Sequence, residues 1–223
     1  MPTITQNHRL GIEVEQRGRV LLARLHGGPR GEFGPEIAAD LAALNGSALG
    51  IGSELALACD YRLMARGDHV IGQPEILLGF PPGGGGTQRL VRLVGTHQGL
   101  VRMLDGGGLD PESAAEIGYV DEVVPADELI DRAVALGDRL AQRLKFTVAA
   151  VKRSAYIGGS LRLEDGLHVE NAEFLSTLAS PGAQQAMLAY MRRTEEMGDL
   201  PLYDPPTYQH TLEAGSFARV AGA

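Results

Sequence analysis

Glycine constrains the fold of this chain strongly, because it occurs in short clusters that break the sequence into brief segments. The chain has 223 residues, of which 30 are glycine, well above the share of about 7% in average proteins. A residue without a Cβ allows tight turns and lets the backbone come close to other atoms. No collagen-like three-residue repeat is present, so the sequence indicates a globular fold with many tight turns between short elements.

Two of the glycine-bounded stretches contain a glutamate. Glu54 follows Gly50-Ile51-Gly52-Ser53, and Glu75 follows Gly72-Gln73-Pro74. A pair of carboxylates held by glycine-rich turns suits acid–base chemistry on a small, uncharged substrate, because one can accept a proton while the other donates one. The ordinary alternative is that both are surface glutamates of an acidic protein, as most glutamates are. The pattern around this pair favours the functional interpretation.

Composition is typical of a soluble globular protein. The hydrophobic content of 44% is ordinary, and the length allows one large domain or two small ones with a real core. The net charge of −8 disfavours binding to nucleic acid or to an anionic membrane surface. A small anionic ligand is still compatible with this charge, because it needs only a local group of basic residues and backbone N–H donors.

Some sites and compartments are disfavoured by the sequence. Cys59 is the single cysteine, which rules out an internal disulfide and a cysteine metal cluster, and its apolar surroundings suggest a buried small side chain. No apolar run reaches the roughly 18–20 residues of a membrane span, and no secretory signal is visible at the N-terminus. We therefore expect a cytoplasmic protein. Lys145 and Lys152 are the only lysines, an arginine bias that suggests a GC-rich bacterial genome.

Four common motifs do not fit this chain. The glycine loop at 83–86 is followed by Thr87, where a phosphate-binding P-loop needs a lysine, and the residues after Gly52 do not complete a dinucleotide-binding pattern. The six histidines have no paired helical spacing, so no metal site is expected. Ser53 does not lie in a nucleophile elbow, which makes a serine hydrolase a poor hypothesis.

Periodicity and turn residues predict strand–turn–helix units first and helices last. Expected strands or extended segments are 12–16, 20–25, 42–44, 61–65, 70–72 continuing through 76–78, and 119–124. Expected helices are 35–41, 53–59, 87–93, 111–117, 127–144, 147–156, 163–178 and 182–193. The sequence thus divides into a core at 1–125, a helical region at 126–197 and a proline-containing tail at 198–223 that is expected to be irregular.

Several stretches match a known pattern in order and spacing: 45–60 (NGSALGIGSELALACD), 72–79, 82–90, 114–120 and 123–126. With these residues the chain resembles the enoyl-CoA hydratase family, also called the crotonase family. The stretch 45–60 is similar to the first signature of that family, and 72–79 with 82–90 is similar to its second. Both signatures together are far more specific than a single glycine pattern, and the resemblance extends over roughly 11–193.

The resemblance implies an α/β fold, a crotonase-like spiral of ββα units with a C-terminal helical trimerisation region. It also implies acyl-CoA thioesters as ligands, a homotrimer or hexamer, and a place in fatty acid metabolism or related acyl degradation. No cofactor is expected, because coenzyme A would be part of the substrate. Neither nucleic acid nor a membrane is an expected partner.

The resemblance further implies roles for individual residues. Glu54 and Glu75 match the two glutamates of the family's hydratases: Glu54 would activate the attacking water, and Glu75 would deliver a proton to the α-carbon. The backbone N–H of Ile51 matches one donor to the thioester oxygen, which suits a helix N-terminus with its unpaired N–H groups, and the Ile51 side chain must then point away from the thioester. The implied substrate-binding loop residues are Gly50, Gly52, Pro82, Gly83 and Gly84.

Compared with that family, the chain lacks a segment near 41–44. Family members carry several tens of residues there, including core strands and a loop that supplies the other oxyanion N–H and much of the CoA contact surface. Either residues are missing from this sequence or the segment is deleted. We favour missing residues, because losing central strands would expose sheet edges and apolar faces. A true deletion would argue against an active hydratase.

The leading hypothesis is therefore an enoyl-CoA hydratase, which adds water across the 2,3 double bond of a 2-enoyl-CoA to give a 3-hydroxyacyl-CoA. Another crotonase-type enzyme is the first alternative, an enoyl-CoA isomerase or an enzyme of aromatic or branched-chain acid breakdown, because isomerisation also needs proton transfer at carbon. A non-catalytic paralogue that keeps the fold is the second. Apolar residues recurring along 163–193 favour subunit contacts through the C-terminal helices.

Overall fold

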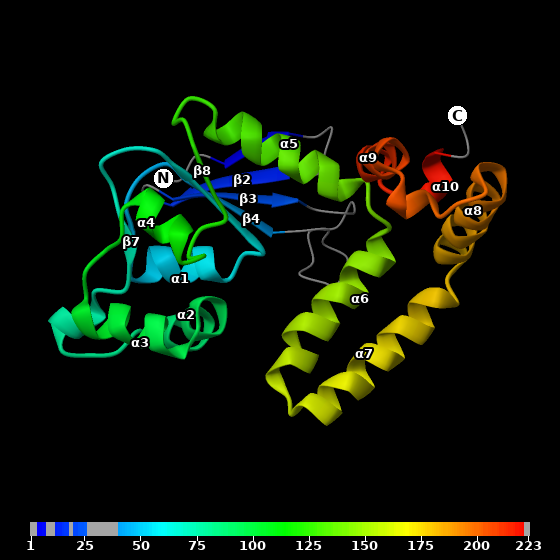
Figure 1. The fold of residues 1–223 in the computed structure, drawn as a ribbon. Helices are drawn as coiled ribbons and strands as arrows, with labels where there is room; N and C mark the ends of the chain where they lie inside the picture. Colours follow the sequence, from blue (N-terminus) through cyan, green and yellow to red (C-terminus); the bar gives the residue numbers. More distant parts are fainter. Residues whose placement is uncertain (1–3, 8–11, 18–19, 26–39, 221–223) are drawn as a thin grey trace. The chain divides into compact units, whose positions relative to one another are not determined.

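The computed structural model of the chain describes residues 4–7, 12–17, 20–25 and 40–220. It forms two compact units (Figure 1). Unit 1 comprises Met1–His26 and Ala39–Gly137, and unit 2 comprises Gly27–Ala38 and Asp138–Ala223. The division falls inside the helix α5 (Leu129–Ala141), whereas the sequence suggested a boundary after residue 125.

Unit 1 is built on a six-stranded mixed sheet with the strand order β1-β2-β3-β4-β6-β8. Its strands are β1 (Ile4–Asn7), β2 (Ile12–Arg17), β3 (Val20–Leu25), β4 (Asp40–Leu44), β6 (Tyr61–Ala65) and β8 (Glu122–Val124). The pairs from β1 to β4 are antiparallel, and β4, β6 and β8 run parallel. The side chains of 41–44 and 62–65 are all buried, as expected for parallel strands covered on both faces. The strand β1 was not expected from the sequence.

The strand β4 lies where the sequence showed a seam, and it has neighbours on both sides. Leu44 pairs with Val20 of β3 and with Met64 of β6. In this structure β4 is therefore an inner strand of the sheet, without the exposed edge that the loss of central strands would leave. The expected helix at 35–41 is wrong for its last two residues, because Asp40 and Leu41 belong to β4 and strand pairing overrides their helical pattern. The rest of that expected helix lies outside the described residues.

Short helices connect the strands of unit 1: α1 (Ile51–Leu57), the 3₁₀ turn η1 (Glu75–Leu78), α2 (Gly86–Val94), α3 (Thr96–Asp105) and α4 (Pro111–Glu116). The expected extension through 76–78 is wrong, because Gly79 with φ 85° ends a 3₁₀ turn there. Residues 119–121 are not strand either, since Tyr119 and Val120 donate backbone hydrogen bonds to Ala114 O at the end of α4. The helix α3 was not expected.

One hydrophobic core joins the sheet of unit 1 to its helices. Its buried members come from the strands β4, β5 (Ala48–Leu49), β6 and β7 (Ile71–Gly72), the helices α1–α4 and the segments that follow α1 and α4. They include Leu44, Met64, Ala56, Leu90 and Tyr119. A second, two-stranded sheet pairs β5 in parallel with β7. This small sheet precedes both glutamate-bearing segments, because α1 follows β5 and η1 follows β7.

Unit 2 is helical. It contains α6 (Lys145–Tyr156), η2 (Gly158–Ser160), α7 (Leu163–Leu178), α8 (Pro181–Met197), η3 (Pro201–Tyr203), α9 (Pro205–Ala214) and α10 (Phe217–Val220). Arg153 of α6 pairs with Glu173 of α7 through two hydrogen bonds of 2.6 Å. At the turn between these helices, a Cβ on Gly166 would lie 2.8 Å from Gly158 O, so this close crossing requires glycine.

The tail from residue 198 is helical, which corrects the expectation of irregular structure. Pro205 occupies the first turn of α9, and the Asp204 side chain accepts a hydrogen bond from Thr207 N at 3.0 Å. Proline is favourable at this position because its missing N–H would be unpaired in any case. The ring of Phe217 then packs edge-on against Tyr190 of α8 at 5.0 Å.

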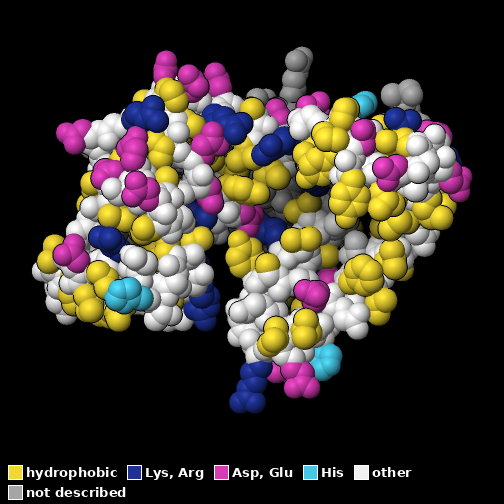
Figure 2. All heavy atoms as spheres, in the orientation of Figure 1, with side chains coloured by type: hydrophobic (Ala, Val, Ile, Leu, Met, Phe, Trp, Pro, Cys, Tyr) yellow, Lys and Arg dark blue, Asp and Glu magenta, His cyan; other side chains and the backbone are white. Residues whose placement is uncertain are grey.

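Hydrophobic side chains are exposed in large numbers on both units (Figure 2). On α7 and α8 they are Leu163, Leu167, Phe174, Leu175, Leu178, Met187, Leu188 and Met191. Exposed apolar surface of this extent is unusual for a monomer. None of the described helices combines the length and apolar character needed to cross a membrane.

Candidate active site

The α1 N-terminus is shaped by Gly50. This residue has φ 56°, a conformation that residues with a side chain rarely adopt. A Cβ at Gly50 would also lie only 2.9 Å from Glu75 Oε1. Backbone geometry and the proximity of the Glu75 carboxylate therefore both require glycine here, and the contact brings Glu75 to the start of the helix that carries Glu54.

Glu54 is held by the glycine loop that precedes α2. It is 4% exposed, and its Oε1 accepts hydrogen bonds from Gly84 N at 2.7 Å and Gly86 N at 2.8 Å. A Cβ at Gly84 would overlap Glu54 Oε2. Arg89 Nη1 in turn donates to Gly84 O at 2.9 Å. Two backbone N–H groups of the loop thus contact the Glu54 carboxylate directly. The hydrogen bond from Arg89 on α2 holds the loop in this shape.

Glu75 begins η1 and is 7% exposed. Its Oε2 is buried without a hydrogen-bond partner in the described part of the chain. A buried acceptor left unpaired costs about 1–3 kcal/mol, and such groups occur at catalytic sites or where a water or ligand binds. Glu75 therefore has one carboxylate oxygen whose capacity to accept a hydrogen bond is not used by any described group.

Ile51 is the first residue of α1, and its side chain is 65% exposed. Its Cδ1 would lie 3.1 Å from a Cβ at Gly84, so this side chain extends over the glycine loop next to Glu54. The N–H groups of a first helical turn have no acceptor within the helix. The Ile51 N–H is thus in a suitable place to donate to a ligand, and its role as an oxyanion donor stays a prediction.

The remaining residues of the expected substrate-binding loop differ in their surroundings. Pro82 is buried, and its Cβ would lie 2.9 Å from a Cβ at Gly86. Gly83 is exposed, and no described atom lies within 4 Å of a Cβ placed on it. Gly52 is half-buried in the first turn of α1. Close packing therefore explains the glycines at 84 and 86, whereas Gly83 has no such structural reason.

Three buried polar side chains near this site were not singled out by the sequence. Ser53 Oγ lies 2.5 Å from the Tyr119 hydroxyl, and Gln73 Nε2 donates to Ser53 Oγ at 3.1 Å and contacts Tyr119 Oη at 3.5 Å. Burial raises the pKa of Tyr119 above 10.0, against the opposing effect of the hydrogen bonds from Ser53 and Gln73. Ser53 directly precedes Glu54 and Gln73 lies two residues before Glu75, a signal that could have found them; Tyr119 lies in the family-like stretch 114–120, but no local pattern linked it to the glutamates.

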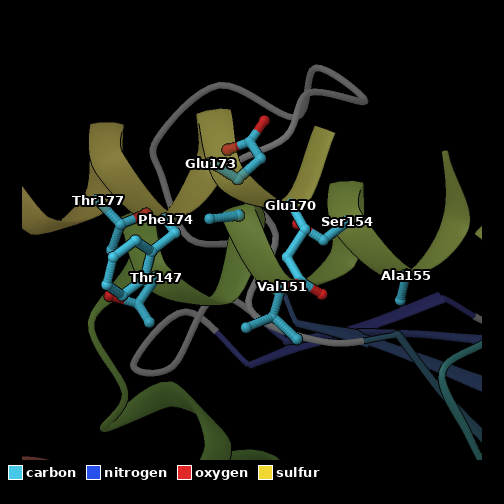
Figure 3. A pocket seen from close by; sticks show the side chains of 9 residues that line it. Thr147, Val151, Ser154, Ala155, Glu170, Glu173, Phe174 and Thr177 are labelled. Atoms are coloured by element: carbon cyan, nitrogen blue, oxygen red, sulfur yellow. The ribbon is translucent and has the colours of Figure 1, made fainter. Parts of the chain in front are cut away.

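A separate cavity of about 430 Å³ lies between α6 and α7 in unit 2 (Figure 3). Its lining includes Phe174, Val151, Thr177 and the carboxylate residues Glu170 and Glu173. Glu173 is already paired with Arg153, and none of the residues expected to act in catalysis lies here. A further cavity of about 340 Å³ is lined by Arg192, Arg193, His210 and Phe217, among others.

Known proteins share both the sequence and the fold of this region. The family model described as enoyl-CoA hydratase/isomerase matches residues 39–197. The chain belongs to this family. The match includes Glu54, Glu75 and the glycine loop, so the recognition made from the two signatures is confirmed, as is the mixed α/β fold class with its helical C-terminal part.

Individual relatives support the family assignment. The chain is 38% identical over 153 residues to the "Probable enoyl-CoA hydratase, mitochondrial" of Dictyostelium discoideum, covering 69% of this chain and 55% of that protein. It is 34% identical to the "2,3-dehydroadipyl-CoA hydratase" of Escherichia coli K12, covering 69% and 60%. A solved enoyl-CoA hydratase structure from Geobacillus kaustophilus superimposes with a TM-score of 0.65 at 33% identity, covering 69% and 58%. The chain therefore spans only a little more than half the length of these relatives.

Within the described residues, no group of three or more histidine, cysteine, aspartate or glutamate side chains is arranged to hold a metal ion. The site described above brings two buried carboxylates together with backbone N–H donors and glycines.

Proposed function

We propose that the chain is an enoyl-CoA hydratase, which adds water across the 2,3 double bond of a 2-enoyl-CoA to give a 3-hydroxyacyl-CoA. The observation that carries the proposal is the unequal environment of two buried carboxylates. Glu54 Oε1 is fixed by two backbone N–H groups, whereas Glu75 Oε2 has no partner among the described residues. Two carboxylates with different surroundings can take different roles in proton transfer.

In the proposed reaction, Glu54 accepts a proton from a water molecule while the water oxygen bonds to C3 of the substrate. Electrons of the double bond move toward the thioester oxygen, and Glu75 donates a proton to C2. Each carboxylate then regains its starting protonation state when the two exchange one proton through the next water. The loop that fixes Glu54 lowers the entropic cost of placing this base, and positioned proton transfer is typically worth about 10²–10⁴-fold in rate.

Negative charge develops on the thioester oxygen during this step, and the Ile51 N–H is the proposed donor that stabilises it. Removing one such donor typically costs about 3–4 kcal/mol of barrier. In the family, the second donor comes from the segment that this chain lacks near 41–44. Gly50, Gly52, Pro82, Gly83 and Gly84 are proposed to contact the substrate around these groups.

The proposed ligand is therefore an acyl-CoA thioester, and the proposed assembly is a homotrimer or hexamer. The names of the relatives favour hydration, because the Dictyostelium protein and the Escherichia coli protein are both named as hydratases. The exposed apolar side chains of α7 and α8 favour an assembly that covers them, since such surfaces are normally buried between subunits.

The hydratase proposal is tested with crotonyl-CoA. Hydration removes the conjugated double bond, so the enoyl absorbance falls and the product mass rises by one water. An isomerase would instead raise that absorbance when it is given a 3-enoyl-CoA. Isomerisation without hydration would replace the proposal with the isomerase alternative. If neither reaction occurs, peptide mapping across 41–44 of the protein made by its native gene decides whether the missing segment is present.

A further inference from the structure

The segments that carry the two glutamates are tied together by one buried hydrogen-bond network. Ser53 immediately precedes Glu54 on α1, and Gln73 lies directly after β7, two residues before Glu75. Gln73 Nε2 donates to Ser53 Oγ at 3.1 Å. The network therefore spans the two segments at the positions next to the carboxylates, on residues that are themselves fully buried.

Tyr119 supplies the third member of this network from a distant part of the chain. Its hydroxyl lies 2.5 Å from Ser53 Oγ across 66 residues of sequence. The backbone of Tyr119 is fixed in turn, because Arg62 Nε donates to Tyr119 O at 3.0 Å and Arg62 Nη2 pairs with Asp121 at 3.0 Å. The contacts with Arg62 of β6 thus hold the backbone that carries the Tyr119 hydroxyl.

The network also reaches the loop that holds Glu54. A Cβ at Gly86 would lie 2.9 Å from Gln73 Oε1, and Gly86 N donates to Glu54 Oε1 at 2.8 Å. Gln73 Oε1 itself has no hydrogen-bond partner among the described residues. The close approach of Gln73 to Gly86 therefore couples the network to the loop residue that donates to Glu54.

We infer that Ser53, Gln73 and Tyr119 are positioning residues, which set the placement of the Glu54 and Glu75 carboxylates relative to each other. Ser53 and Gln73 hold the two glutamate-bearing segments together, and Tyr119 fixes Ser53 from behind. Proton donor and acceptor must stay within a fraction of an ångström of their productive geometry, and a displacement of about 1 Å can cost 10²-fold in rate. The activity readout of this inference rests on the proposed hydratase function; its geometric readout does not.

The test uses Tyr119→Phe, Ser53→Ala and the double variant S53A/Y119F in the full chain. Each single variant removes one oxygen from the network, and the double variant replaces both hydroxyl partners with apolar groups, a change that can be nearly neutral for stability. Ser47→Ala is the matched control. Ser47 Oγ accepts one hydrogen bond, from Val70 N at 3.2 Å, in the same unit but outside the network.

Tyr119→Phe and Ser53→Ala are expected to lower kcat for hydration of crotonyl-CoA about 10- to 100-fold, with KM within about twofold. The double variant is expected to lose no more than the larger single effect, because both act through one network. Ser47→Ala should keep kcat within about twofold. Full activity in Tyr119→Phe and Ser53→Ala would overturn the inference. An equal loss in Ser47→Ala at equal stability would overturn it too, since the network would then be merely structural.

Crystal structures of the wild type and of S53A/Y119F give the second readout. The Glu54 Oε1 distances to Gly84 N and Gly86 N, and the position of Glu75 against Gly50, are expected to change in the variant. Unchanged positions of both carboxylates would overturn the inference regardless of activity. A wild type that hydrates no enoyl-CoA would sink the proposed function alone, and the movement of the carboxylates would then decide the positioning role.

Discussion

Glu54 lies against the bare Cα of Gly84: its Oε1 accepts the Gly84 N–H at 2.7 Å, and a Cβ on Gly84 would overlap its Oε2. The catalytic candidate and the glycine loop are thus one structural unit, although 30 residues separate them in sequence. Any side chain at 84 must displace the carboxylate or the loop. This relationship explains why a glycine cluster is needed next to an acid–base group.

Glu54→Gln and Glu75→Gln are each expected to lower hydratase kcat by about 10²–10⁴-fold, because glutamine cannot exchange the required proton. The glutamine at 54 can still accept the N–H groups of Gly84 and Gly86, so the fold should be kept. Steady-state kinetics with crotonyl-CoA and circular dichroism check both points. Near-normal turnover in a folded variant would remove that residue from the mechanism.

Gly84→Val and Gly85→Val are expected to lower both activity and stability. Valine at 84 would collide with the Glu54 carboxylate, and valine at 85 would combine φ 105° with an overlap on Arg89. Gly159→Ala is the control, because no described atom lies within 4 Å of a Cβ there. Thermal unfolding and kcat are measured for all three. Wild-type values in both valine variants would mean that the loop does not approach the site as described.

The start of α9 is expected to weaken in acid. The hydrogen bonds from Thr207 hold the pKa of Asp204 below its usual value of 3.8. A lowered folded-state pKa means that this contribution to stability is present above pH 3.8 and is lost as the pH falls through the folded value. Asp204→Asn keeps a capping side chain without the charge. The unfolding midpoint of Asp204→Asn should therefore fall less than that of the wild type when the pH is lowered from 5 to 3, the region in which carboxyl groups titrate. An equal fall of the unfolding midpoint in both proteins would contradict the stabilising role of the Asp204 carboxylate.

The 23.7 kDa chain is expected to sediment as a trimer or a doubled trimer. Leu175→Glu on α7 and Leu188→Glu on α8 place charge on exposed apolar positions and should shift the mass toward the monomer. Ser176→Glu adds the same charge beside Leu175 at an exposed polar position and should leave the assembly intact. A wild-type monomer at all concentrations in sedimentation equilibrium would sink the prediction.

Sequence alone was enough to recognise the family and to single out the two glutamates and the glycine clusters beside them. The signatures are local, since Gly50 lies four residues before Glu54, and short motifs carry them directly; the contacts that require glycine at 50 and 84, with Glu75 and Glu54, are tertiary. The helix at 163–178 was also predicted with the bounds that α7 has. Its periodicity is a property of neighbouring residues, and no distant partner is needed to recognise it.

Which distant residues meet depends on the three-dimensional fold. Asp40 and Leu41 became strand because β3 and β6 pair with β4 on both sides, and pairing partners outweigh local propensity. The tail became helical because Asp204 caps α9 and Phe217 packs on Tyr190. Tyr119 reached Ser53 for the same reason: a contact across 66 residues depends on how the sheet and helices pack, and no local pattern in the sequence encodes it.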